Sequence, residues 1–161
     1  MLTTVEKRAI QRSWQLVAPI ADTAADLFYK RLFELAPGYR KMFGGDLEPQ
    51  KRKLVAMLRF IVKSLDWPDE TWRDAVSLED DLFLIVLALG RRHAVLYRVP
   101  DESYDVVGQA LLWALDYGLG EAFTPETRAA WTRVYQLLAT TMKLGRTACA
   151  DGPRPREVDH A

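Results

Sequence analysis

The segment from Gln50 to Leu65 carries the clearest helical period of the chain. Its apolar residues recur at spacings of three and four, which place them on one face of an α-helix: Leu54, Met57, Leu58, Ile61, Val62 and Leu65. Gln50 lies one turn before Leu54 on that face, and the basic run Lys51 to Lys53 beside it is typical of a solvated helix surface. Since no strand alternation or repeat stands out elsewhere, we expect an all-α fold with six or more helices.

Caps, prolines and glycines divide the rest of the chain into further helices. Thr3 or Thr4 is expected to cap a first helix that Pro19 interrupts, and a second helix is expected over 21–35. Asp46 is the predicted cap of the helix described above, and Gly145 the predicted end of the last one. The other expected helices cover 82–93, 100–117 and 125–145, with an irregular connection over 66–81. The residues expected to face the core are Val5, Ile10, Trp14 and Val17 in the first helix, Ala24, Ala25, Phe28, Leu32 and Phe33 in the second, Tyr104, Val107, Leu111, Ala114 and Leu115 in the fifth, and Trp131, Val134, Tyr135, Leu138 and Met142 in the last.

Charge and length limit the function classes that fit the chain. A chain of 161 residues is long enough for one domain, and its 22 basic and 22 acidic residues cancel. This balance does not favour a nucleic-acid or anionic membrane partner. The single Cys149 excludes an internal disulfide framework, and no apolar run reaches the length of a membrane helix. We therefore expect a cytoplasmic protein.

Few residues of the chain point to metal or catalytic chemistry. The sequence has no Cys/His cluster with zinc spacing, no glycine-rich phosphate loop and no nucleophile elbow. The acids Glu79 to Asp81 fit a helix start better than a metal site. His93 follows the apolar run LFLIVLAL (82–89) and the residues GRR (90–92), and an imidazole there either caps a helix end or ligates a metal through one ring nitrogen.

Six motifs in a fixed order give the chain a family resemblance. They are FYKRLFELAP (28–37), MF (42–43), QKRKLVAML (50–58), LGRRH (89–93), YDVVGQALLWAL (104–115) and AFTPETRAAWTRVY (122–135). Together they resemble the globin family, and in particular bacterial single-domain globins and the globin part of flavohaemoglobins. The resemblance implies a globin fold of six to eight helices around a haem pocket. It covers a globin domain over 1–146, and the Pro- and charge-rich remainder, 147–161, is expected to be a disordered tail.

The resemblance also implies roles for individual residues, each of which has a purely structural alternative. His93 matches the histidine that ligates the iron of haem b, while Tyr29 and Gln50 match the distal pair that faces a bound gas. The other residues expected at the haem are Phe43 on its face, Leu54 over the iron, Tyr104 on the proximal side, Lys53 and Arg92 at the propionates, and Leu89 and Val99 in the pocket wall. The structural alternatives are core packing for Phe43 and Tyr29, an exposed first-turn position for Gln50, and a structural hydroxyl for Tyr104.

The function expected from this resemblance is reversible binding of oxygen, and of nitric oxide or carbon monoxide, at haem iron. One alternative is a nitric oxide dioxygenase that works with a separate reductase, since the chain has no flavin or nicotinamide domain of its own. Flavohaemoglobins also place a glutamate in the last helix where this chain has Arg146, which makes activation of oxygen less expected. Further alternatives are a haem-based gas sensor and a regulatory module that binds no haem.

Overall fold

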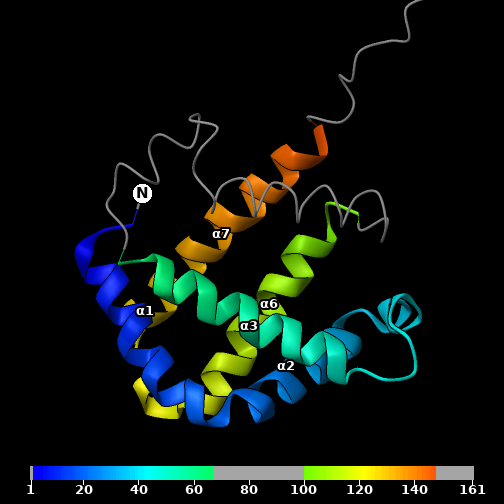
Figure 1. Ribbon diagram of the computed structural model, residues 1–161, viewed down its shortest axis with the longest axis horizontal. Helices are drawn as coiled ribbons and strands as arrows, with labels where there is room; N and C mark the ends of the chain where they lie inside the picture. The colour runs from blue at the N-terminus through cyan, green and yellow to red at the C-terminus, as the bar shows by residue number, and fades with distance from the viewer. Residues whose placement is uncertain (1, 67–99, 148–161) are drawn as a thin grey trace, which may run out of the picture.

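The computed structural model describes residues 2–66 and 100–147, and within these ranges the chain forms helices and turns without a strand (Figure 1). The elements are α1 (Thr4–Val17), η1 (Ala18–Ile20), α2 (Ala21–Leu35), η2 (Pro37–Met42), α3 (Glu48–Ser64), α6 (Ser103–Leu119), η3 (Gly120–Ala122) and α7 (Pro125–Thr147). The prediction of an all-α fold is confirmed. The expected connection over 67–81, the helix over 82–93 and the tail from 148 onward lie outside the described residues.

Local capping signals set several of the helix ends. Thr3 and Glu6 form a capping box at the start of α1: the Glu6 N–H donates to Thr3 Oγ1 at 3.2 Å, and the Thr3 N–H donates to Glu6 Oε2 at 2.6 Å. Thr124 Oγ1 accepts a hydrogen bond from the Thr127 N–H at 3.2 Å and begins α7 in the same manner. At the end of α6, Gly120 has a φ of +53°, a backbone conformation that glycine adopts without steric cost.

Two predicted helix starts differ from the structure. Asp46 is not the cap of α3, because Leu47 occupies that position; Asp46 Oδ1 accepts the Glu48 N–H at 3.0 Å from one residue further out. In α6, residues 100–102 first form a turn in which the Ser103 N–H donates to the Pro100 carbonyl at 3.0 Å. The helix therefore begins at Ser103, and Pro100 and Asp101, where the helix is expected to begin, lie in the turn before it.

Two other predictions are wrong for geometric reasons. Val5 is 71% exposed, because it lies five positions before buried Ile10, and this spacing places the two about 140° apart around the helix axis. Gly145 is buried within α7, which continues to Thr147. A glycine permits a helix end but does not impose one, and Gly145 is not among the described glycines with positive φ.

The core lies where α2 crosses α6 and α3, and where α1 packs against α7. Most residues predicted to face inward are buried there, among them Ile10, Phe28, Leu111 and Trp131. The Trp131 indole is 1% exposed and donates through Nε1 to Ser13 Oγ at 2.9 Å, which joins α7 to α1. In the part of the chain that the structure describes, no helix is long and apolar enough to cross a membrane.

Candidate functional site

An aromatic cluster joins α2 to the segment between η2 and α3. The ring of Tyr29 lies 4.9 Å from that of Phe28, 6.0 Å from Phe33 and 5.6 Å from Phe43, measured between centroids. Phe33 and Phe43 also contact each other edge to face at 5.6 Å. Edge-to-face pairs at these separations are favourable beyond their buried area. Tyr29 and Phe43, which the sequence predicts to share one site, are therefore direct neighbours in the fold.

Tyr29 is a buried residue with a hydroxyl that can donate a hydrogen bond. The residue is 7% exposed, and burial raises the pKa of its hydroxyl to about 12, although the nearby Lys51 ammonium acts in the opposite direction. The hydroxyl therefore keeps its proton at neutral pH. Among residues 2–66 and 100–147, the fully buried side-chain polar atom that lacks a hydrogen-bond partner is Arg31 Nε, so the Tyr29 hydroxyl is not an orphaned donor.

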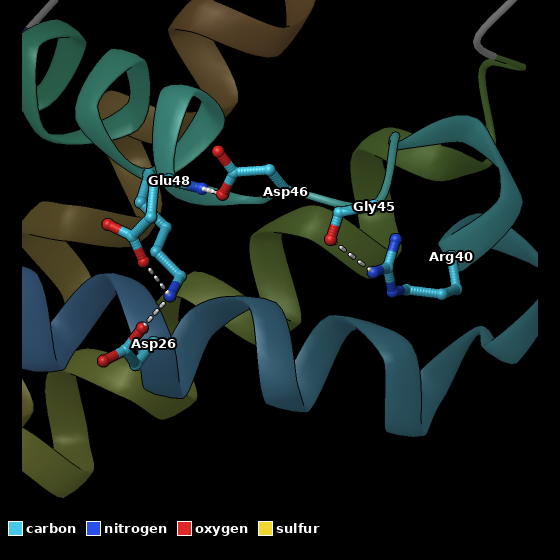
Figure 2. Close-up of polar contacts among 6 residues, drawn as sticks. Asp26, Arg40, Gly45, Asp46 and Glu48 are labelled. Atoms are coloured by element: carbon cyan, nitrogen blue, oxygen red, sulfur yellow. Dashed lines mark hydrogen bonds and ion pairs between the residues drawn. The ribbon is translucent and has the colours of Figure 1, made fainter.

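Arg40 holds the turn that carries Phe43. Its Nη1 donates to the carbonyls of Phe43 at 3.2 Å and Gly44 at 2.8 Å. Its Nη2 donates to the Gly45 carbonyl at 3.4 Å, the contact drawn in Figure 2. The same guanidinium lies 5.6 Å from the centroid of the Phe33 ring. One side chain thus satisfies three successive carbonyls of an exposed turn and covers the aromatic cluster.

The first turns of α3 carry Gln50, Lys51 and Leu54. Gln50 and Leu54 are both half-buried, so Gln50 is not the fully exposed residue of the structural alternative. Lys51 forms ion pairs with Asp26 of α2 and, at 2.9 Å, with Glu48 of its own helix. Figure 2 shows the Asp26 and Glu48 carboxylates pointing to one place between the two helices. The hydrogen bonds that its ammonium donates to Asp26 and to Glu48 raise the pKa of Lys51, and burial opposes this shift only in part. Lys53 is exposed, as a residue at a pocket rim would be.

A small apolar cavity of about 20 Å³ lies beside Leu54, among α1, α2, α3 and α6. Its walls carry no polar surface; they are formed by Trp14, Val17, Ala21, Ala24, Ala25, Phe28, Leu54, Val55, Leu58, Leu111, Ala114 and Leu115. A space of this kind favours dry contents, because water would find no hydrogen-bond partner there. Leu54 thus lines this core cavity, one turn after Gln50 on α3.

Tyr104 stands apart from the aromatic cluster, at the start of α6. It is half-buried, its carbonyl accepts a hydrogen bond from the Tyr135 hydroxyl, and Lys143 Nζ lies 5.5 Å from the centroid of its ring. These contacts tie α6 to α7 and describe a structural position, while the proposed proximal role stays a prediction.

Four predicted site residues lie outside the described residues: Leu89, Arg92, His93 and Val99. The metal-ligand prediction for His93 is therefore not tested, and no group of three or more metal-binding side chains occurs in residues 2–66 and 100–147. Sequence reasoning missed Arg40 and Asp26, and it treated Lys51 as part of a solvated face. The Glu48–Lys51 spacing was a local signal for an ion pair, but the Asp26 contact depends on how two helices cross.

Both the sequence and the fold of this chain are similar to those of known proteins. Residues 26–142 match the family model described as Globin. The chain is 30% identical over 152 residues to a neuroglobin of Danio rerio and 28% identical over 158 residues to one of Tetraodon nigroviridis, with 89% of this chain and 92% of each relative covered. Among solved structures, the haemoglobin of the shortfin mako shark (Isurus oxyrinchus) is similar in fold, with a TM-score of 0.69 and 18% identity over 91% of this chain and 99% of that one.

Proposed function

This chain belongs to the globin family, and from that premise we propose that it binds haem b and, through it, oxygen and other diatomic gases reversibly. The observation that carries the proposal is the buried Tyr29 in edge-to-face contact with Phe43 at 5.6 Å, which places a protonated hydroxyl among apolar rings. A tyrosine hydroxyl in such surroundings can donate a hydrogen bond to a small polar ligand.

The side chains around Tyr29 fit a flat, largely apolar cofactor. Phe33, Phe43 and Leu54 are half-buried apolar groups, so they leave apolar surface uncovered within the described part of the chain. Such surface suits a macrocycle, and a single polar donor within it suits a small polar ligand. His93 would hold the iron, and Lys53 and Arg92 would face the propionates, as the sequence predicts.

When bound, haem supplies a ferrous iron with an open position for a diatomic gas. The protein's own contribution is then the environment of that position. Tyr29 would donate a hydrogen bond to the gas, and Gln50 from α3 would offer its amide from the same side. Phe43 and Leu54 would exclude water from the site. A net hydrogen bond of about 0.5–1.5 kcal/mol slows release up to about tenfold.

The direct test is a visible absorption spectrum of the purified protein in the ferric, reduced and carbon monoxide-treated states. We expect a Soret band that shifts with carbon monoxide and disappears in His93→Ala. Tyr29→Phe should keep the Soret band and speed oxygen dissociation up to about tenfold. Absence of a Soret band after addition of hemin would reject the haem proposal and favour the regulatory module.

The finer relationship to flavohaemoglobins rests on the sequence motifs around Tyr29 and Gln50, whereas the relatives named above are vertebrate neuroglobins. Nitric oxide consumption separates the carrier from the dioxygenase. A carrier consumes at most one equivalent of nitric oxide per oxygen-loaded protein. Sustained turnover with an added reductase would contradict the carrier proposal.

A further inference from the structure

Lys51 connects the two helices that carry the predicted distal residues. Its ammonium contacts Asp26 on α2 and lies 2.9 Å from Glu48 Oε1 on α3. Its own side chain is 20% exposed, while those of Asp26 and Glu48 are 59% and 60% exposed. The cation therefore lies between the helices, and its partners reach it from the surface.

The position of this contact along each helix matters. Asp26 is three residues before Tyr29, and Lys51 directly follows Gln50, so the ion pair lies within one turn of both distal residues. Leu54 is one turn after Gln50 on α3. A movement of the first turn of α3 away from α2 would therefore move Gln50 away from Tyr29.

Leu47 and Leu54 pack the start of α3 against the hydrophobic core, but its polar attachments to other helices are few. Its N-cap residue, Leu47, makes no side-chain cap hydrogen bond, and the chain before it passes through Gly44 and Gly45. Asp46 satisfies the Glu48 N–H, but that contact is local and does not reach α2. The Lys51–Asp26 ion pair, in contrast, joins the first turn of α3 to another helix.

We propose that Lys51 is a positioning residue: its ion pair with Asp26 is a latch that holds the first turn of α3, and with it Gln50, against the Tyr29 side of α2. Opening of the latch widens the approach to Tyr29 from the solvent. The consequence for gas entry rests on the proposed function, whereas the attachment of α3 to α2 does not. Partly exposed ion pairs are weak, so thermal opening is frequent and the latch limits entry without blocking it.

The test compares Lys51→Met with Arg52→Met in the full-length protein. Both variants remove one positive charge from the same helix turn, but Arg52 is exposed and makes no ion pair among the residues that the structure describes. Amide hydrogen exchange of peptides covering 44–54 reports the attachment of α3 whether or not haem is bound. Carbon monoxide recombination after flash photolysis reports entry to the site.

Lys51→Met is expected to speed exchange in 44–54 and carbon monoxide association about two- to fivefold. Arg52→Met should change neither rate. Lys51→Arg keeps the positive charge, so both rates should stay close to those of the unaltered protein. Asp26→Asn should reproduce Lys51→Met, and the double variant should add little, because the two substitutions break the same contact.

Unchanged exchange in Lys51→Met, or an equal change in Arg52→Met, would overturn the latch. Faster exchange in Lys51→Met with unchanged carbon monoxide association would overturn its role in entry. If no Soret band forms, the proposed function fails, and exchange still decides whether Lys51 holds α3 against α2.

Discussion

The ring of Tyr135 on α7 lies directly over the backbone of Gly108 on α6. A β-carbon at Gly108 would stand 2.6 Å from Tyr135 Cε1 and 3.0 Å from Cδ1, well inside van der Waals contact. The Tyr135 hydroxyl also donates to the carbonyl of Tyr104, one turn earlier on α6. The absence of a side chain at Gly108 therefore sets how closely α6 and α7 approach.

Gly108→Ala should destabilise the protein by about 1–3 kcal/mol, because the ring and the helix must separate. This loss opposes the gain of about 1 kcal/mol that alanine normally gives in a helix. Gly118→Ala is the matched control on the same helix, since its β-carbon would meet Ile20 Cδ1 at an ordinary 3.5 Å. Urea unfolding followed by circular dichroism measures both, and equal effects of the two variants would contradict the role of Tyr135.

Ser13→Ala should cost about 1–3 kcal/mol, because it leaves the buried Trp131 Nε1–H without its acceptor. The hydrogen bond joins α1 to α7, so the loss concerns tertiary packing and not helix content. A double-mutant cycle with Trp131→Phe isolates the contact from the loss of indole volume. The double variant should lose less than the two single variants together, and strict additivity would refute the coupling.

Deprotonation of the Tyr29 hydroxyl should make the protein less stable at alkaline pH. Its pKa is raised by burial to about 12, above the ordinary value of 10, and burial also raises the pKa of Tyr135. The folded state thus keeps protons that the unfolded chain releases. This contribution to the free energy of unfolding is complete below pH 10 and is lost as the pH rises towards about 12. Urea midpoints measured across this window should fall with pH, and they should fall less steeply in Tyr29→Phe. Identical pH dependence in the two proteins would show that the Tyr29 hydroxyl has the ordinary pKa of an exposed tyrosine.

Arg40→Ala should loosen the turn that carries Phe43, because three carbonyls lose a charged donor. We expect a loss of about 1 kcal/mol in local stability, as the contacts are exposed to solvent. Lys41→Ala is the control, since Lys41 is an exposed neighbour of the same sign. Amide exchange over 40–47 should rise several-fold in Arg40→Ala alone. Equal exchange rates over 40–47 in the two variants would show that the turn is stable without the Arg40 hydrogen bonds.

Much of the fold could be predicted from local signals. The cap at Thr3, one of the two threonines expected there, and the bounds of α2 depend on residues within one turn of each other, and both agree with the structure. The errors at Asp46 and Gly145 arise where a local signal permits an outcome without imposing it, whereas Val5 does not share a helix face with Ile10. Leu47 rather than Asp46 became the helix cap because the aspartate could satisfy the same N–H from one residue further out.

For the candidate site, the sequence by itself determined the residue types: a tyrosine and phenylalanines near the end of one helix, and a glutamine and a leucine one turn apart on another. It could do so because spacing along a helix fixes which side chains share a face. Only the tertiary structure decided that Tyr29 is buried against Phe43, that Lys51 meets Asp26 and that Tyr135 covers Gly108. Those contacts join residues distant in the chain, and their geometry depends on how the helices cross, which no local pattern encodes.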